Sequence, residues 1–307
     1  MSPVPAFFAG YQTRVDEALR RLVRPERGPV ERSMGYTLFA RSKRVRPVLT
    51  LLSAELCGGQ AARALGAAAA MELVHTSSLI LDDLPSMDNA ELRRGQRANH
   101  LEFGEAIAIL AAFALLNLAY GTLARSYDAH LSTRLATLLD DAVGHDGLIA
   151  GQAADLLAAG SDLDSPIEPQ TSENRDLTPD RTISFELLER IHRGKTGALF
   201  NASAVAGALT AGADADSVSA LSAFAKNLGL AFQIIDDLLD VEGDPSQTGK
   251  AIRKDARKTT FVSFSGVAGA HQLAAELCQT ADRALAPFGR RADRLRELSA
   301  FVAARSI

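Results

Sequence analysis

The sequence contains no tryptophan, only two cysteines and few aromatic residues of any kind. Two isolated cysteines, Cys57 and Cys278, exclude a disulfide framework and do not form a zinc site. We therefore expect a cytoplasmic protein, since a reducing compartment keeps thiols free. Aromatic residues make up 6% of the chain, whereas alanine and leucine are abundant, and this balance favours helices over strands.

The chain also lacks a strong net charge and a long uninterrupted apolar run. The formal net charge is −4, which predicts no binding to nucleic acid or to an anionic membrane surface. An anionic substrate must therefore be bound by local cations or by a metal ion. The first residues lack the basic and apolar regions of a secretory signal. Charged or small polar residues interrupt the apolar runs before about 18 residues, so we expect no membrane span.

Apolar residues recur at helical spacing along most of the chain, and alternating strand-like patterns are scarce. This spacing predicts an all-α protein with one domain over residues 1–307, built as a single large helical bundle. A polar segment with three prolines predicts a surface loop at 160–182. The predicted helices cover residues 9–23, 31–57, 61–84, 102–127, 130–158, 183–211, 215–240, 268–287 and 290–304.

An aspartate cluster with the spacing DDxxD follows an apolar segment at residues 228–235. On a helix, Asp236 and Asp240 lie one turn apart on one face, separated by roughly 40°. Asp237 completes the cluster. Taken alone, such a cluster is as consistent with solvated acids at a helix end as with a metal site.

A second cluster, formed by Asp82, Asp83 and Asp88, follows the apolar segment 71–81. Its spacing, DDxxxxD, would place Asp88 on the wrong side of a regular helix. Pro85 disrupts helical hydrogen bonding, and a bulge there would bring Asp88 back toward Asp82. Both clusters would then present carboxylates of the kind that hold Mg²⁺ together with substrate phosphates. Because unpaired buried charge is costly, two such clusters beside apolar faces indicate a cation-binding pocket.

Basic residues flank both clusters. They are Lys43, Arg44 and Arg46; Arg93 and Arg94; Lys195, next to Thr196; and Lys250, Lys254 and Lys258. Arginine suits bidentate contact with phosphate oxygens, and lysine supplies a mobile positive charge. Metal and cations together indicate a diphosphate site. The Gly-Lys pairs at 194–195 and 249–250 lack the earlier glycine and the preceding strand of a Walker A loop, so we do not expect a nucleotide kinase.

These residues stand in blocks that resemble, in order, the motifs of the trans-isoprenyl diphosphate synthases, the polyprenyl synthetase family. The blocks are SKRVRP (42–47), LDDLPSMDNAELRRGQ (81–96), GQAADL (151–156), GKTGAL (194–199), FQIIDDLLD (232–240) and TGKAIRKDARKTT (248–260). The resemblance covers about residues 30–265 and is strongest to bacterial geranylgeranyl diphosphate synthases of carotenoid-type pathways. It implies a helical bundle around a deep apolar cavity, and a homodimer.

The resemblance also implies a reaction and a role for each matching residue. The reaction is the Mg²⁺-dependent head-to-tail condensation of isopentenyl diphosphate with an allylic diphosphate (dimethylallyl, geranyl or farnesyl), with about three ions per site. The metal ligands would be Asp82, Asp83, Asp88, Asp236, Asp237 and Asp240. The allylic diphosphate would be held by Arg93, Lys195 and Lys250, with Thr196 and Gln233 near the reacting carbons. The diphosphate of isopentenyl diphosphate would be bound by Lys43, Arg46, His75 and Arg94.

The residues before Asp82 predict the length of the product. One helical turn rises about 5.4 Å, close to the span of one isoprene unit, so the helix that ends at Asp82 should line the pocket for the growing chain. Bulky aromatics at the positions of Ser77 and Ser78 would form a floor, as in farnesyl diphosphate synthases. Two serines leave the passage open, which predicts geranylgeranyl diphosphate, a C20 product, for carotenoid or diterpene biosynthesis. The candidates for a deeper or facing floor are Leu73, Val74, Ile109 and Phe113.

Three other functions stay open. A shorter product would make the protein a farnesyl diphosphate synthase. A class I terpene cyclase also uses DDxxD on a helical fold, but it normally has a different second metal motif and does not need KRxRP. A non-catalytic partner subunit usually loses aspartates from one cluster, whereas both clusters are intact here. His75 on its own would be interpreted as a core histidine.

Overall fold

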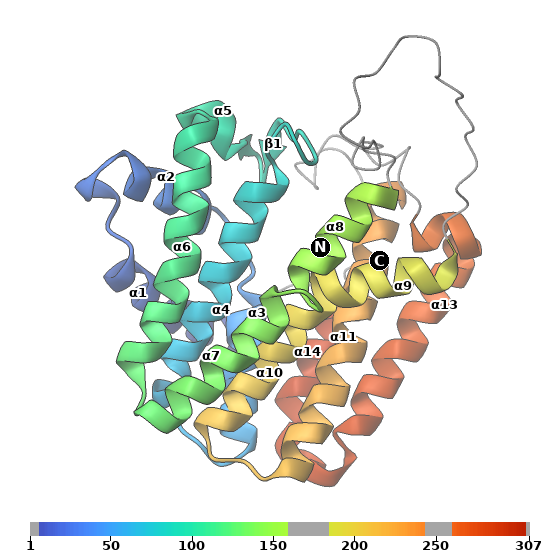
Figure 1. The fold of residues 1–307 in the computed structure, drawn as a ribbon. Helices are drawn as coiled ribbons and strands as arrows, with labels where there is room; N and C mark the ends of the chain where they lie inside the picture. The colour runs from blue at the N-terminus through green and yellow to red at the C-terminus, as the bar shows by residue number, and fades with distance from the viewer. Residues whose placement is uncertain (1–5, 159–183, 243–259, 305–307) are drawn as a thin grey trace.

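The computed structural model describes residues 6–158, 184–242 and 260–304, which form a bundle of α-helices (Figure 1). The helices are α1 (Ala6–Leu22), α2 (Pro29–Leu38), α3 (Val45–Leu56), α4 (Ala61–Asp82), α5 (Asn99–Phe103), α6 (Glu105–Ser126), α7 (Ala129–Val143), α8 (Leu148–Ala158), α9 (Phe185–His192), α10 (Ala198–Thr210), α11 (Ala215–Glu242), α13 (Phe261–Ala284) and α14 (Asp293–Ala303). The shorter elements are two 3₁₀ turns, η1 (Pro25–Arg27) and η4 (Ala286–Ala292), the π-helical turn η3 (Arg193–Gly197), and a hairpin of β1 (Leu92–Arg93) and β2 (Gln96–Arg97). The predicted all-α fold is confirmed. The predicted surface loop at 160–182 and Lys250 lie outside the described residues.

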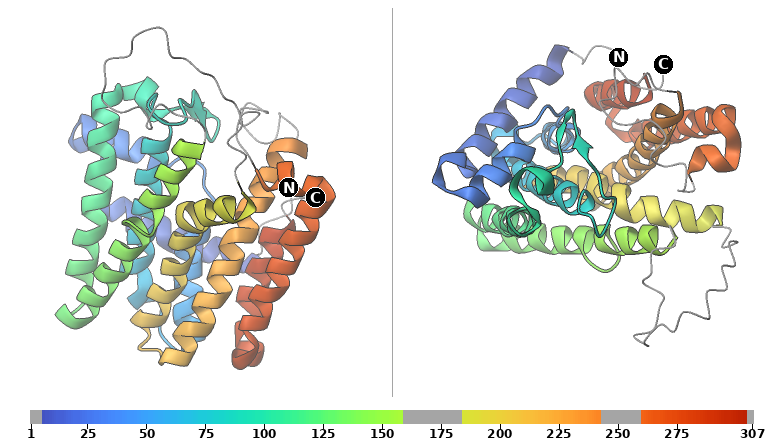
Figure 2. Two further views of the ribbon diagram at one scale, coloured as in Figure 1. Left: turned by 45° about the vertical axis from the view of Figure 1, so that its right-hand side comes forward. Right: turned by 90° about the horizontal axis from the view of Figure 1, so that it is seen from above.

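The helices are arranged around α10, which packs against α3, α4, α7 and α11. On one side α6 packs against α4, and on the other α13 packs against α11. Figure 2 shows α2 at one edge of the bundle and α13 at the opposite edge, while α1 contacts α14, where the ring centroids of Phe8 and Phe301 lie 5.9 Å apart. Both α4 and α11 run toward the end of the bundle that carries the β1–β2 hairpin (Figure 1). The two helices that precede the aspartate clusters therefore end on the same side of the molecule.

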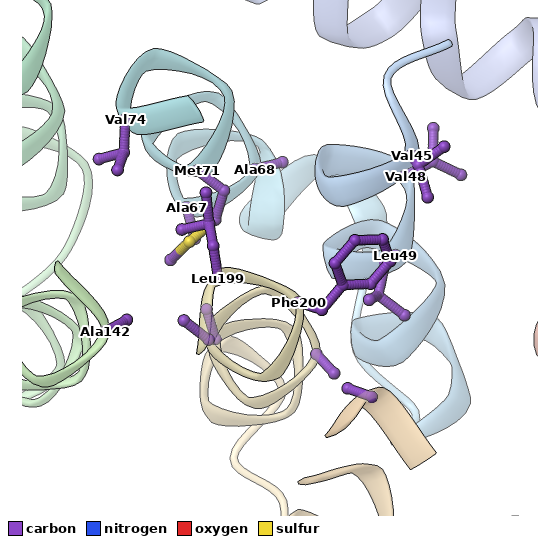
Figure 3. Packing of buried hydrophobic residues seen from close by; sticks show 14 of the residues in the cluster. Val45, Val48, Leu49, Ala67, Ala68, Met71, Val74, Ala142, Leu199 and Phe200 are labelled. Carbon is purple, nitrogen blue, oxygen red and sulfur yellow. The ribbon is translucent and has the colours of Figure 1, made fainter. Parts of the chain in front are cut away.

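Small side chains allow the central helices to approach closely. A Cβ atom on Gly207 of α10 would lie 2.2 Å from the carbonyl oxygen of Thr50 on α3, so only glycine fits this crossing. Leu199 and Phe200 of α10 lie between α4 and α3 and are almost fully buried (Figure 3). Burial of each such side chain contributes about 1.5–3 kcal/mol to stability. The position of η3, which directly precedes α10, is therefore fixed by a tightly packed core.

Two predicted helices are broken by non-helical segments, and a third, expected at 183–211, is divided into α9 and α10 by the π-turn η3. The helix expected at 31–57 is divided into α2 and α3, because Arg44 adopts a left-handed backbone conformation (φ 53°). The helix expected at 130–158 is divided into α7 and α8 at residues 144–147. In addition, α13 begins at Phe261, seven residues earlier than expected, where Thr260 caps its first turn by accepting a hydrogen bond from the amide of Ser263.

Three helices, α4, α6 and α11, have the length and apolar composition of a membrane span, although polar residues such as Glu72 in α4 and Asn117 in α6 interrupt their apolar runs. Much of their apolar surface is used inside the bundle: 67% of the apolar window of α4 and 50% of that of α11 are buried. Only 39% is buried in α6, whose outer face exposes Leu110 and Phe113. The apolar residues of α4 and α11 thus supply the protein core.

Candidate active site

The chain turns back directly after α4, and this turn brings Asp88 to Asp82. The helix ends at Asp82, and the amide of Asp88 donates a hydrogen bond to the carbonyl of Asp82 (2.9 Å). The amide of Ala90 likewise donates to the carbonyl of Asp83 (3.2 Å). Pro85 lies within this turn. The return of Asp88 toward Asp82, which Pro85 predicted, is confirmed.

The carboxylates of this first cluster have different surroundings. Asp83 is 1% exposed and forms an ion pair with Arg93, whose Nε lies 2.9 Å from Asp83 Oδ1. Burial raises the pKa of Asp82 to about 6, although Lys195 lowers it, and the neighbouring Asp88 raises it further. Asp83 therefore orients an arginine, while Asp82 and Asp88 form a pair of acids that a bound cation would stabilise.

The second cluster lies near the end of α11. Asp237 is 7% exposed and accepts hydrogen bonds from the amide of Phe261 (3.1 Å) and from Gln233 Nε2 (3.0 Å). Burial raises the pKa of Asp237 to about 7 against the effect of these two hydrogen bonds. Asp236 and Asp240 are half-buried and contribute repulsion to the same shift. As in the first cluster, one acid is fixed by protein donors and two are more accessible.

The π-turn η3 lies between the two clusters. The sequence predicted a continuous helix here, but the wider π-turn changes the direction of the side chains and is frequent at functional sites. On one side, burial alone would lower the pKa of Lys195, but Asp82 and Asp155 raise it. On the other side, Thr196 Oγ1 donates to Gln233 Oε1 (2.9 Å), the residue that also binds the second cluster. Adjacent residues of one turn thus face both aspartate clusters.

An acidic residue that the sequence did not assign completes this region. Asp155 Oδ2 lies 2.8 Å from Lys195 Nζ, and both side chains are about one-fifth exposed. The contact depends on the close approach of α8 to η3, since a Cβ on Gly151 would lie 2.3 Å from the backbone nitrogen of Lys195. The only sequence signal was the position of Asp155 in the block GQAADL, one helical turn after Gly151.

The cations predicted for the second diphosphate meet around His75. Arg46 Nη1 and Arg94 Nη2 each lie 3.4 Å from His75 Nε2. Burial lowers the pKa of His75 well below its usual value, and Arg46 and Arg94 lower it further. His75 is therefore neutral near pH 7, and its Nε2 faces both guanidinium groups as an acceptor. The Arg46 guanidinium also lies 4.8 Å from the ring centroid of Phe200.

Lys43, three residues before Arg46, is contacted by two other helices. Its ammonium lies 5.3 Å from the ring centroid of Phe301 on α14. Its carbonyl accepts a hydrogen bond from Gln12 Nε2 of α1 (2.9 Å). Arg94 is presented by the β1–β2 turn, where its φ is 55°. The four residues predicted for isopentenyl diphosphate thus lie on α4, on the segment between α2 and α3, on the first turn of α3 and on the hairpin.

The residues predicted to control product length lie along the seam between α4 and α6. Ser77 is 4% exposed, and its Oγ donates to the carbonyl of Ala112 on α6 (2.8 Å). Ser78 Oγ donates to the carbonyl of His75 (2.9 Å). Small residues therefore occupy both sides of the seam at this depth.

Among the candidates for a deeper floor, Leu73 and Val74 are buried, and Ile109 packs against the core. Phe113 does not line the interior of the chain, because its side chain is 62% exposed. The reason is helical geometry: Ala112 faces α4, and the next residue is rotated by about 100° around α6. The prediction that Phe113 forms part of the pocket wall was wrong for the single chain.

Neither of two surface depressions, of about 260 and 290 Å³, is lined by an aspartate of either cluster. The deep apolar cavity therefore stays a prediction. Within residues 6–158, 184–242 and 260–304, no three His, Cys, Asp or Glu side chains could hold a metal ion by themselves. Mg²⁺ usually retains several waters and substrate phosphates, so the donor set fits an ion that a ligand bridges rather than a closed protein cage.

The fold and the site together define an all-helical protein in which the acidic clusters lie beside Lys195 and Arg93. The chain belongs to the polyprenyl synthetase family, whose sequence profile matches residues 28–283. It is therefore a prenyltransferase, as the sequence predicted.

Several relatives illustrate this membership. Farnesyl diphosphate synthase of Geobacillus stearothermophilus is 39% identical over 92% of this chain and 91% of its own length. A heterodimeric geranylgeranyl pyrophosphate synthase large subunit of Arabidopsis thaliana is 40% identical over 86% of this chain and 68% of its own. The apo structure of an FPP/GFPP synthase from Zymomonas mobilis has a TM-score of 0.80 at 31% identity and covers 97% of both chains.

Proposed function

We propose that the protein is a magnesium-dependent trans-polyprenyl diphosphate synthase that condenses isopentenyl diphosphate with an allylic diphosphate and makes geranylgeranyl diphosphate. The observation that carries the proposal is the position of η3. Lys195 interacts with Asp82 and Asp88, and Thr196 is connected through Gln233 to Asp237. A diphosphate bound beside this turn would be within reach of both aspartate clusters.

The aspartates provide the donors for magnesium, about three ions per site. Asp83 and Asp237 are buried and accept hydrogen bonds from the protein, whereas Asp82, Asp88, Asp236 and Asp240 are only partly buried and can be reached by an ion. When bound, magnesium stabilises the negative charge of the departing pyrophosphate. Lys195 and Arg93 would hold the same diphosphate by charge-assisted hydrogen bonds. The metal ligands are Asp82, Asp83, Asp88, Asp236, Asp237 and Asp240.

The second diphosphate, that of isopentenyl diphosphate, would be bound by Lys43, Arg46 and Arg94, with His75 as the neutral acceptor between the two arginines. The two substrates would meet near Thr196. The allylic C–O bond breaks, and the isopentenyl double bond attacks the allylic carbon. The new C–C bond is followed by loss of a proton to the departing pyrophosphate, so the chain needs no general base of its own.

A C20 product is supported by the small residues of the α4–α6 seam. Ser77 and Ser78 leave little bulk at the first turn of the pocket, and the buried Leu73 and Val74 lie about one turn deeper on α4. The distance between these levels is close to one isoprene unit. The relatives include synthases of both farnesyl and geranylgeranyl products, so product length needs a direct measurement.

The experiment is product analysis with the purified chain, Mg²⁺, isopentenyl diphosphate and each allylic starter in turn. We expect a C20 product from dimethylallyl, geranyl and farnesyl diphosphate. A reaction that ends at C15 would identify a farnesyl diphosphate synthase and refute the C20 proposal. Turnover of farnesyl diphosphate without isopentenyl diphosphate would indicate a terpene cyclase. An inactive purified chain would indicate a non-catalytic subunit.

We also propose that the active protein is a homodimer in the cytoplasm. The outer face of α6, which exposes Leu110 and Phe113, is an apolar surface that a second protein could cover. Light scattering coupled to gel filtration should give twice the chain mass of 32.6 kDa. A mass of one chain, with full activity, would contradict the dimer.

A further inference from the structure

One arginine of the block SKRVRP is turned away from the site and is fully engaged inside the protein. Arg44 is 4% exposed, and its Nη1 lies 2.6 Å from Glu72 Oε1 on α4. Its Nε lies 2.9 Å from Asp16 Oδ1 on α1, and its Nη2 donates to the carbonyl of Leu38 (2.6 Å). Each nitrogen of the Arg44 guanidinium therefore has a partner within the protein.

These contacts hold an unfavourable backbone conformation. Arg44 has a φ of 53°, in the left-handed region that a residue with a Cβ adopts only when its surroundings enforce it. At this turn the side chain of Arg44 points into the protein. The side chain of Lys43 lies over the ring of Phe301, and that of Arg46 lies over the ring of Phe200. The inward arginine therefore determines where the two outer cations of the block are placed.

Glu72 is the buried counter-charge of this arrangement. It is 1% exposed and lies on α4 one helical turn before His75. Its negative charge acts on Arg94 as well as on Arg44. The arginines whose charges act on His75 are Arg46, Arg94, Arg93 and Arg44. These positively charged guanidinium groups repel one another. The negative charge of Glu72 offsets part of this repulsion, and its ion pair is with Arg44.

We propose that Glu72 is a positioning residue for the isopentenyl diphosphate subsite. By holding Arg44, it fixes the left-handed turn that presents Lys43 and Arg46 to the diphosphate of that substrate. The inference rests on the proposed function, which assigns this diphosphate to Lys43 and Arg46. Loss of the carboxylate allows the turn to relax to an ordinary right-handed conformation and displaces both cations.

The substitution Glu72→Gln separates positioning from simple charge. It removes a negative charge beside a site for an anion, so an effect of charge alone would tighten binding of the diphosphate. Positioning predicts the opposite, because Arg44 loses its strongest partner and the flanking cations move. The direction of the change in KM for isopentenyl diphosphate therefore distinguishes the two explanations.

The experiment measures kcat and both KM values, together with calorimetric binding of isopentenyl diphosphate. For Glu72→Gln we expect the KM for isopentenyl diphosphate to rise by about tenfold or more, with the KM for the allylic substrate within about twofold. Glu72→Asp, which keeps the charge on a shorter side chain, should give an intermediate value. Glu55→Gln is the matched control, because Glu55 also pairs with an arginine, Arg294 (3.2 Å), but lies away from the cation group; both KM values should stay unchanged.

A KM for isopentenyl diphosphate that is unchanged or lower in Glu72→Gln overturns the inference, as does an equal rise in both KM values. If Glu72→Gln does not fold, Asp16→Asn provides the test. The side chain of Asp16 is 40% exposed, and this substitution weakens only one of the contacts of Arg44. It should raise the same KM by about two- to fivefold, and no change would overturn the inference. A wild-type protein without turnover of isopentenyl diphosphate would instead refute the proposed function.

Discussion

The contact between Asp155 and Lys195 gives the most informative prediction about the allylic site. Replacing Asp155 with asparagine keeps the size of the side chain but removes the negative charge that holds Lys195 Nζ at 2.8 Å. The ammonium of Lys195 is then drawn toward Asp82 and Asp88, the other acids that act on it. There it would compete with magnesium for the carboxylates and would leave its place beside the diphosphate.

The size of the effect follows from the geometry. A hydrogen bond between charged groups contributes about 1.5–3 kcal/mol, and the partial exposure of Asp155 and Lys195, 18% and 20%, favours the lower end of this range. A difference of about 1.4 kcal/mol corresponds to a tenfold change in rate. We therefore expect Asp155→Asn to lower kcat/KM for the allylic substrate by about 10- to 30-fold, and to raise the magnesium concentration needed for half-maximal rate.

The assay is steady-state condensation with varied allylic diphosphate and varied Mg²⁺. Glu189→Gln is the matched control, because Glu189 forms an ion pair of similar length with Arg193 (2.6 Å) next to the same turn. The side chain of Arg193 is 68% exposed, so this pair contributes little and its loss should change kcat/KM by less than about twofold. The reasoning would be refuted if kcat/KM of Asp155→Asn for the allylic substrate stayed within about twofold of the wild-type value. An unchanged magnesium requirement in this variant would refute it as well.

Three further predictions concern product length, metal and packing. Ser77→Phe should shift the product from C20 to C15, because an aromatic ring fills the α4–α6 seam. Chromatography of the products tests this, and an unchanged C20 product would refute the hypothesis that this position limits chain length. Burial raises the pKa of Asp82 to about 6 and that of Asp237 to about 7. Between about pH 4 and pH 7 the metal-free folded protein therefore binds more protons than the unfolded chain, and its stability falls as the pH rises. Mg²⁺ should therefore raise the calorimetric Tm more at pH 8 than at pH 5, and an equal shift would contradict this. Gly151→Ala should lower stability by about 1–3 kcal/mol in denaturant titration, because its Cβ meets the backbone of Lys195; a stability equal to the wild type would contradict the close approach.

The sequence predicted the helical class and the two aspartate clusters because both depend on local information. Helical spacing of apolar residues reports burial directly, and the proline after Asp83 predicted the turn that returns Asp88 to Asp82. The blocks of the family resemblance also placed Lys195 and Thr196 beside the clusters. In the structure, the π-turn that carries them lies between the two clusters.

What the sequence could not predict depends on contacts between distant segments. The break at Arg44 is caused by Glu72 and Asp16, which lie 28 residues away on either side. Asp155 could not be assigned from its own helix, because its partner lies 40 residues further along the chain. Phe113 was a candidate for the floor of the pocket, whereas only the packing of α6 on α4 shows that its side chain points outward.

The central claim, that both aspartate clusters bind one diphosphate through magnesium, is tested most directly by calorimetric binding of inorganic pyrophosphate with and without Mg²⁺. We expect pyrophosphate to bind only with Mg²⁺, and to bind about tenfold more weakly to Asp82→Asn and to Asp236→Asn. Because both clusters share one ligand, the loss of affinity in the double variant should be much smaller than the product of the two single losses. Equal binding in the presence of a chelator, or an Asp236→Asn variant that binds as the wild type does, would contradict the claim.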